Sequence, residues 1–357
     1  MYIQNVNIQN FRNYENINLE LSKGINILTG DNAQGKTNLL EAIYICSTAR
    51  SHRTNHEKQV IRWEQQGAYV SLDIKKNFLE DQINFCITNK GKSVAINKIP
   101  ITKLDELFGV LNTVIFSPED LQLIKKSPKE RRRFIDIEMC QVDKVYYYLL
   151  RQYYKVLKQR NNYLKQNFGK IDNNMLDTWD LQLEKFAVEL IKKRKLFIHT
   201  LNNIASKIHY DLSNKTEHLE IIYDYSVDDK EFLEKLSRAR RRDLATQTTY
   251  VGPHKDDLKF VINGVDAKLY ASQGQQRSIV LSIKLSEVEL IRETKQESPV
   301  LLLDDVLSEL DIYRQEYLLT YTKDIQTIIT CTGIEQSVWK SLEIGKLYRV
   351  IDGTIIT

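Results

Sequence analysis

The 357-residue sequence has few cysteines, glycines and prolines and no long apolar run, so it lacks the features of disulfide-linked domains, flexible segments and membrane spans. Its four cysteines lie far apart and form no Cys-x-x-Cys pair, which argues against a disulfide framework or a zinc site and fits a reducing cytosol. With 13 glycines and five prolines, it has no collagen-like or low-complexity segment. It lacks the run of about 18 apolar residues that spans a membrane, and its N-terminus lacks the pattern of a signal peptide. We therefore expect a globular, cytoplasmic protein of about two domains that does not associate with a membrane.

An excess of one charge is also nearly absent when the whole chain is counted. The 51 Lys and Arg residues exceed the 47 Asp and Glu residues by only four, which does not identify a nucleic-acid-binding protein. The excess is local, because residues 120–170 hold 13 basic and five acidic side chains, whereas residues 171–245 hold 13 and 14. On charge alone, the first segment is either a surface for an anionic partner or a solvated helical face.

The two ends of the chain differ from its middle. Residues 25–29 and 300–303 are short apolar runs typical of buried strands, and Asn263-Gly264 after an apolar run predicts a hairpin. Between residues 121 and 242 apolar side chains recur at helical spacing, and glycine occurs only at position 169, where we expect the chain to reverse.

This pattern predicts an α/β fold with a discontinuous main domain. Residues 1–120 and 246–357 would form one domain from both chain ends, and residues 121–245 would be inserted into it as an antiparallel helical arm.

The first motif that carries chemistry is Gly30-Asp31-Asn32-Ala33-Gln34-Gly35-Lys36-Thr37, which matches GxxxxGK[ST]. It follows a predicted strand and precedes helix-forming residues, which is the context of a phosphate loop. Backbone N–H groups of such a loop surround phosphate oxygens, and the helix N-terminus adds the positive end of its dipole. We predict that residues 30–37 bind ATP, that Lys36 reaches the β- and γ-phosphates and assists catalysis, and that Thr37 ligates Mg²⁺. A glycine-rich turn with an incidental lysine is the weaker interpretation.

A second motif, Val300-Leu301-Leu302-Leu303-Asp304-Asp305, places two acids at the end of a predicted buried strand. Beside a phosphate loop, Asp304 is placed to hold Mg²⁺ through water, and Asp305 to polarise the attacking water as a catalytic residue. A helix N-cap is the alternative role for two adjacent acids.

Two shorter motifs follow the same logic but are weak when taken alone. Ser272-Gln273-Gly274-Gln275-Gln276-Arg277 puts a serine and a glycine just ahead of a predicted helix, which forms a second anion-binding N-terminus. Ser308-Glu309-Leu310-Asp311 comes shortly after the acidic strand.

Together and in this order, the four motifs resemble those of the ATP-binding cassette heads of the SMC, Rad50 and RecF group. In such heads the signature motif of one subunit completes the ATP site of another. The resemblance therefore implies an ATP-dependent homodimer with two composite sites, in which Ser272, Gly274 and Gln275 contact the nucleotide bound by the partner. It also implies that Arg12 contacts nucleotide, although an arginine at this strand is often a surface residue.

Within that group the chain is most similar to the RecF family of bacterial recombination mediators. The similarity covers nearly the whole chain, and the matching segments occur in the family's order: Phe11 to Tyr14, Phe116 to Leu121, Arg131 to Asp136, Gly252 to Asp257, Ala271 to Arg277 and Leu301 to Asp311.

Membership of this family would imply an ATP-driven dimer that binds double-stranded and gapped DNA and helps RecR- and RecO-type mediators to load recombinase. It would act in recombinational gap repair, replication restart and SOS induction, with weak, DNA-stimulated ATP hydrolysis. We assign the DNA contact to Arg131, Arg132 and Arg133, in the basic segment.

Several alternatives remain open. Asp305 stands where transporter cassettes carry glutamate, and Cys331 lies near the place of their switch histidine, so a transport ATPase subunit is the less favoured function. A chromosome-structuring ATPase of the SMC or Rad50 kind would need a much longer arm. His254 either lines the site or satisfies a turn, and Arg50 and Arg53 are candidates for contacting DNA or the neighbouring subunit.

Overall fold

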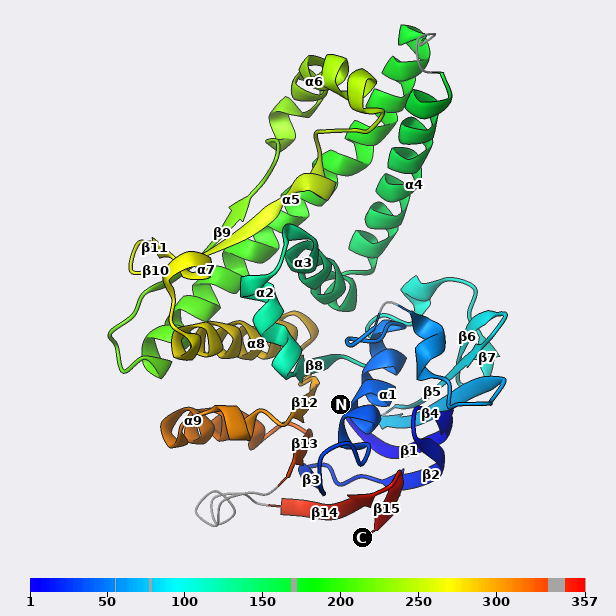
Figure 1. Cartoon of the computed structure of the whole chain (residues 1–357), viewed down its shortest axis with the longest axis vertical. Helices are drawn as coiled ribbons and strands as arrows, with labels where there is room; N and C mark the ends of the chain where they lie inside the picture. Colours follow the sequence, from blue (N-terminus) through cyan, green and yellow to red (C-terminus); the bar gives the residue numbers. More distant parts are fainter. Residues whose placement is uncertain (55, 77–78, 168–171, 333–343, 357) are drawn as a thin grey trace. The chain divides into compact units, whose positions relative to one another are not determined.

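The computed structural model describes residues 1–54, 56–76, 79–167, 172–332 and 344–356 (Figure 1). The chain folds into two compact units, Met1–Leu121 with Arg277–Thr357, and Gln122–Gln276. No helix among the described residues is long and apolar enough to cross a membrane.

A mostly parallel sheet in the first unit brings the two chain ends together. Its strands, in spatial order, are β15 (Thr354–Ile356), β14 (Ile344–Ile351), β3 (Ile25–Thr29), β13 (Thr327–Cys331), β12 (Val300–Asp304) and β8 (Thr113–Phe116). Only β15 is antiparallel to its neighbour. Every residue of β12 is buried, as predicted for a strand covered on both faces. Since β3 and β12 both flank β13, the segments that follow all three strands lie at one edge of the sheet.

An antiparallel sheet completes the first unit. Its spatial order is β2 (Tyr14–Glu20), β1 (Tyr2–Phe11), β4 (Gly67–Lys75), β5 (Glu80–Thr88), β6 (Gly91–Ile96) and β7 (Ile99–Pro100). Helix α1 (Lys36–Thr48) packs against strands of both sheets and is buried on nearly every side, and its apolar residues lie at the centre of one hydrophobic core. Because Lys36 is the first residue of this buried helix, the phosphate loop is anchored in the core.

Among the described residues, the first unit also has the short helices η1 (Glu57–Val60), η2 (Leu104–Glu106), η3 (Pro118–Leu121), η6 (Leu307–Glu309) and α9 (Ile312–Thr322). The long helix α8 (Gln273–Lys295) begins at the last residues of the second unit and continues in the first.

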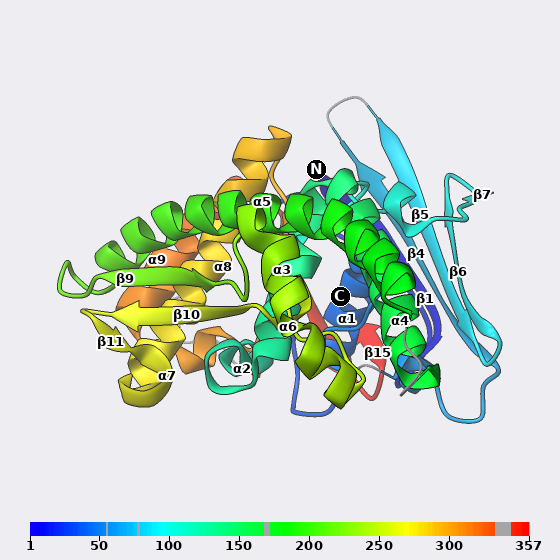
Figure 2. The same ribbon diagram turned by 90° about the horizontal axis from the view of Figure 1, so that it is seen from above.

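The second unit is largely helical. Its helices are α2 (Gln122–Lys125), α3 (Pro128–Val142), α4 (Lys144–Gln166), α5 (Asn173–Leu212), η4 (Asp229–Glu231), α6 (Phe232–Thr246), η5 (Pro253–Lys255) and α7 (Ala267–Tyr270). Helices α4 and α5 pack against each other as the predicted helical pair, which is seen from above in Figure 2. The reversal predicted at residue 169 lies outside the described residues.

Two predictions about this unit were wrong. The helical pattern expected up to residue 242 is interrupted by strand β9 (Leu219–Asp224), which pairs with β10 (Asp257–Ile262), and β10 forms the predicted Asn263-Gly264 hairpin with β11 (Val265–Asp266). Because β9 belongs to the middle of the chain, its pairing holds residues 246–276 in the second unit. We had expected them in the main domain.

Buried ion pairs hold the second unit together. The guanidinium of Arg160 on α4 is fully buried and donates to Asp180 and Asp243, both at 2.7 Å. Arg194 on α5 is likewise buried and donates to Asp136 at 2.7 Å and to Asp256 at 3.3 Å. Part of the basic content of this unit is therefore structural and faces away from solvent.

His254 has a structural role in this unit, which decides between the two interpretations of this residue. Its Nε2 lies 3.0 Å from the carbonyl oxygen of Thr249, which can only accept, so Nε2 carries the proton. Its Nδ1 then accepts from the hydroxyl of Tyr153 at 2.6 Å. Burial lowers the pKa of His254 to about 4.

This histidine should make the second unit sensitive to acid. Its pKa in the folded chain lies below the ordinary value of about 6.5. The unfolded chain therefore gains a proton first as the pH falls, and stability present above pH 6.5 is lost between pH 6.5 and 4. His254→Gln does not titrate but can still donate to Thr249. We expect the free-energy difference between wild type and His254→Gln in urea unfolding to narrow by roughly 2 kcal/mol from pH 7.5 to 5. A constant difference would contradict a neutral, buried His254.

Candidate nucleotide-binding site

The phosphate loop has the backbone geometry that its glycines make possible. Gly30 and Gly35 have φ angles of 150° and 116°. A Cβ atom at Gly30 would lie 2.4 Å from the carbonyl oxygen of Val350, and one at Gly35 would lie 2.6 Å from the side chain of Asn13. Any larger residue at either position would displace the loop.

The N-terminal hairpin holds this loop from outside. The amide of Asn13 donates to the carbonyl oxygen of Gln34 at 2.8 Å, and the hydroxyl of Tyr14 donates to that of Gly35 at the same distance. Both bonds use carbonyl oxygens of the loop, so they do not occupy its N–H groups, which would bind phosphate. They also give a structural reason for the Phe11-to-Tyr14 motif.

The side chain of Lys36 folds back onto the start of the loop. Its ammonium donates to the carbonyl oxygens of Gly30 at 2.5 Å and Asp31 at 2.7 Å, and the side chain is almost fully buried. The positive charge is therefore held beside the N-terminus of α1, where an anion is favoured.

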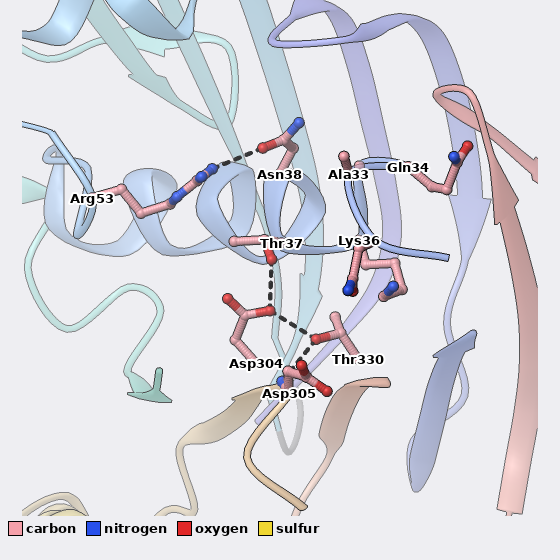
Figure 3. A pocket seen from close by; sticks show the side chains of 11 residues that line it. Ala33, Gln34, Lys36, Thr37, Asn38, Arg53, Asp304, Asp305 and Thr330 are labelled. Carbon is pink, nitrogen blue, oxygen red and sulfur yellow. Dashed lines mark hydrogen bonds between the residues drawn. The ribbon is translucent and has the colours of Figure 1, made fainter. Parts of the chain in front are cut away.

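Asp304 joins the loop to the opposite end of the chain (Figure 3). One of its carboxylate oxygens accepts from the hydroxyl of Thr37 at 2.8 Å and from that of Thr330 at 2.7 Å. Burial raises the pKa of Asp304 above its ordinary value, and the two hydrogen bonds oppose that rise. A cation at this carboxylate would compensate its burial.

Asp305 adopts an unusual backbone conformation, with a φ of 53°. Its N–H donates to the Thr330 hydroxyl at 3.0 Å, which fixes the turn after β12. Its Oδ1 is buried, with no hydrogen-bond partner among the described residues. Positive φ in a non-glycine residue and an unpartnered buried oxygen are both features of functional sites.

These groups line one pocket of about 350 Å³ in the first unit. Its lining residues are Asn32, Ala33, Gln34, Gly35, Lys36, Thr37, Asn38, Arg53, Asp304, Asp305 and Thr330. The structure thus brings together most of the predicted loop and both predicted acids.

The sequence predicts that Arg53 contacts either DNA or a neighbouring subunit. In the structure this residue lines the pocket. Its guanidinium donates to the Asn38 side chain at 2.9 Å and lies 3.4 Å from Glu41 (Figure 3). Its position soon after the end of α1 was the only available signal.

Arg12, by contrast, is not among the lining residues. Its guanidinium binds both carboxylate oxygens of Glu41, at 2.9 and 2.7 Å. Burial acts to raise the pKa of Glu41, but the hydrogen bonds from Arg12 and Ser51 lower it below its ordinary value. Glu41 also pairs with Arg53, so Arg12 supports a residue of the pocket lining through this carboxylate. The nucleotide contact of Arg12 stays a prediction.

The signature residues lie in the second unit and form a capping box at the start of α8. The Ser272 hydroxyl accepts from the N–H of Gln275 at 3.2 Å, and the Gln275 side chain accepts from the N–H of Ser272 at 2.8 Å. Ser272 and Gly274 are exposed at the start of this helix.

The structure corrects the DNA contact assigned to Arg131, whereas the DNA contacts of Arg132 and Arg133 stay predictions. Arg131 is 3% exposed and donates to both carboxylate oxygens of Asp257, at 2.5 and 2.9 Å. Arg132 is half-buried and donates to the carbonyl oxygen of Asp256 at 2.6 Å, and Arg133 is also half-buried. Arg131 cannot reach a DNA phosphate while this pair is intact.

Comparison with known proteins agrees with this geometry. The model of the RecF/RecN/SMC N terminal domain family matches residues 2–352. A DNA replication and repair protein RecF from Lachnoclostridium phytofermentans is 48% identical over 357 residues, which cover 99% of each chain. The chain belongs to the RecF family of DNA replication and repair proteins.

Solved structures give the same fold for this RecF-family chain. The structure of the recombination mediator protein RecF-ATP in the RecFOR pathway has a TM-score of 0.93 and 36% identity, covering 99% of this chain and 97% of that one. A Smc head domain with an extended coiled coil from Pyrococcus furiosus, at 15% identity and a TM-score of 0.56, shares the head fold alone.

The buried position of Arg131 gives a direct prediction. Arg131→Ala should lower the free energy of unfolding by about 3 kcal/mol, because it leaves the Asp257 carboxylate without its partner. Lys129→Ala, an exposed control on the same helix, should change it by less than about 0.5 kcal/mol. Urea unfolding followed by circular dichroism measures both. If Arg131→Ala weakened DNA binding without lowering stability, the original DNA assignment would be restored.

Proposed function

We propose that this RecF-family chain binds ATP with Mg²⁺ in the 350 Å³ pocket and hydrolyses it slowly. The single observation that carries this proposal is the meeting of the Thr37 hydroxyl and the Asp304 carboxylate at 2.8 Å, beside the Lys36 ammonium and inside a glycine-shaped loop. This is a combination of donors, acceptors and positive charge that suits a polyphosphate and its counter-ion. The likeness to a RecF-ATP structure at 36% identity supports it.

The oxygen ligands at this edge of the sheet fit Mg²⁺, which prefers carboxylate, hydroxyl and water oxygens. Thr37 and Asp304 would hold it, and the ion would neutralise charge on the phosphates when bound. The residues themselves do the rest. The loop N–H groups and Lys36 bind and orient the phosphates, and Asp305 Oδ1, which has no partner among the described residues, is placed to accept a hydrogen bond from water.

The dimer is proposed from the signature residues. The N-terminus of α8 is exposed at Ser272 and Gly274, where the positive end of the helix dipole favours an anion, and no side chain before Arg277 in this motif carries charge. A second copy that presents its bound ATP would supply that anion. ATP that binds the dimer more tightly than the monomer shifts the association equilibrium towards the dimer.

The biological role proposed for this dimer is that of a DNA-bound mediator. It would bind duplex DNA near single-strand gaps, act with RecR- and RecO-type proteins to load recombinase in the cytoplasm, and serve gap repair, replication restart and SOS induction. The basis is family membership. Hydrolysis of ATP, stimulated by DNA, would release the dimer.

ATP binding should depend on Lys36. Lys36→Ala removes a nearly buried ammonium that faces the phosphates, so we expect ATP affinity to fall at least 30-fold, a loss of about 2 kcal/mol. Fluorescence titration with a labelled ATP analogue measures this. The exposed Lys90→Ala serves as the control and should bind as wild type does. Equal affinities for the two variants would contradict the assignment of the pocket.

Hydrolysis should depend on Asp305 more than binding does. Asp305→Asn keeps the shape but loses the negative charge that polarises water, so the rate should fall about 100-fold or more while ATP affinity changes little. Phosphate release at saturating ATP gives the rate, and the exposed Asp324→Asn is the control. A large loss of affinity with the rate at saturation intact would assign Asp305 to binding only.

The dimer is tested by size-exclusion chromatography with light scattering. We expect wild type to be a dimer with ATP and Mg²⁺ and a monomer without them. Ser272→Arg, which blocks the exposed end of α8, should bind ATP but remain a monomer. If ATP does not promote dimerisation of wild type, the composite-site proposal fails.

A further inference from the structure

Helix α4 carries a continuous positive face. Five of its six basic side chains are exposed, and they recur at spacings of seven, four, three and seven residues. They are Lys144, Arg151, Lys155, Lys158 and Lys165. At 100° per residue these positions fall within one narrow stripe, hereafter the α4 stripe, opposite the buried face that includes Tyr146, Tyr153 and Leu164.

No negative charge balances the α4 stripe. The helix from Lys144 to Gln166 contains neither Asp nor Glu. None of the five cations takes part in an ion pair with any residue that the structure describes. On the neighbouring helix α5 several cations are paired, as Lys192 is with Glu189 at 3.1 Å and Lys193 with Asp143 at 2.6 Å.

Such a face destabilises the free protein. Arg151 and Lys155, four residues apart, repel each other, as do Lys155 and Lys158, three residues apart. Lys144, at the first turn, also faces the positive end of the helix dipole. A solvated helix face gains stability from mixed charges, so an unmixed face points to an anionic partner that compensates the repulsion.

The dimensions and chemistry of the α4 stripe suit duplex DNA. At about 1.5 Å per residue the stripe is about 32 Å long, close to the pitch of one duplex turn of about 34 Å. The exposed side chains between the cations are uncharged and include the hydrogen-bonding groups of Tyr148 and Asn162, which are of a kind that commonly contacts the sugar–phosphate backbone. A rigid row of lysines and arginines matches repeated phosphates without reading base sequence.

We propose that the α4 stripe is a phosphate-binding surface for duplex DNA, and that it acts without ATP. The stripe replaces Arg131, which is buried, as the leading DNA contact. All five cations belong to one helix of the second unit, so the surface is complete without nucleotide or a second copy. The inference rests on the proposed DNA-binding function, but it adds an ATP-independent component to it.

The test is DNA affinity in the absence of nucleotide. The variant Arg151→Gln, Lys155→Gln, Lys158→Gln removes three charges of the stripe. Its matched control, Lys207→Gln, Lys215→Gln, Lys235→Gln, removes three exposed charges elsewhere in the same unit. Fluorescence anisotropy with a labelled duplex of about 30 base pairs, from about 0.05 to 0.2 M salt, gives affinity and salt dependence for both variants and for wild type.

We expect the stripe variant to bind at least tenfold more weakly than wild type at about 0.1 M salt, with the slope of log affinity against log salt reduced by two to three. The control variant should bind as wild type does. Since all substitutions are at exposed positions, circular dichroism should show unchanged helix content.

Other outcomes separate the two proposals. If the stripe variant and the control bind DNA equally, the stripe is a solvated face and the inference is wrong. If the stripe variant instead loses affinity only for phosphatidylserine vesicles, the partner is a membrane surface and the inference is again wrong. If wild type fails to dimerise with ATP while the stripe variant loses DNA affinity, the ATP-gated function fails and the α4 stripe stands.

Discussion

Two hydroxyls that donate to one buried carboxylate oxygen connect the ends of this chain. Thr37 follows the phosphate loop, Asp304 ends β12, and Thr330 lies near the end of β13. The bond between Thr37 and Asp304 spans 267 positions in sequence. It exists because β3, β13 and β12 are adjacent and parallel, so that their carboxyl ends share one edge. The pocket therefore requires that both chain ends fold together, and the residues between them form a separate, inserted unit.

The charged side chains have different surroundings in the two units. In the first unit, the buried charges of Lys36 and Asp304 line the pocket that we propose for ATP and Mg²⁺. In the second unit, Arg131 and Arg160 are buried and paired with acids, while the cations of the α4 stripe are exposed and form no ion pair with any described residue. The local basic excess seen in the sequence thus contains two populations with opposite roles, one holding the fold and one facing solvent.

The parts of the fold and the site that depend on residues close in sequence could be predicted. The glycines and lysine of the phosphate loop, the wholly apolar β12 and the Asn263-Gly264 turn each specify their own conformation within a few residues. The sequence also predicted the ATPase-head fold through the order of its motifs, and the family comparison confirmed it.

What the sequence could not show depends on partners far along the chain. Arg131 seemed to be a DNA contact because its acid, Asp257, is 126 positions away. Strand β9 was hidden inside a helical pattern because only its pairing with β10 makes it a strand. Arg53 joined the pocket through the path of the backbone after α1, which no motif records.

The central claim, that ATP is shared between the loop of one subunit and the signature of another, is tested most directly by mixing two inactive variants. Lys36→Ala lacks a working loop, and Ser272→Arg lacks a working signature. Each alone should remain monomeric and inactive with ATP and Mg²⁺. An equimolar mixture should form dimers and regain hydrolysis, because one composite site per heterodimer is intact. A mixture that stays monomeric and inactive, under conditions in which wild type dimerises, would contradict the account.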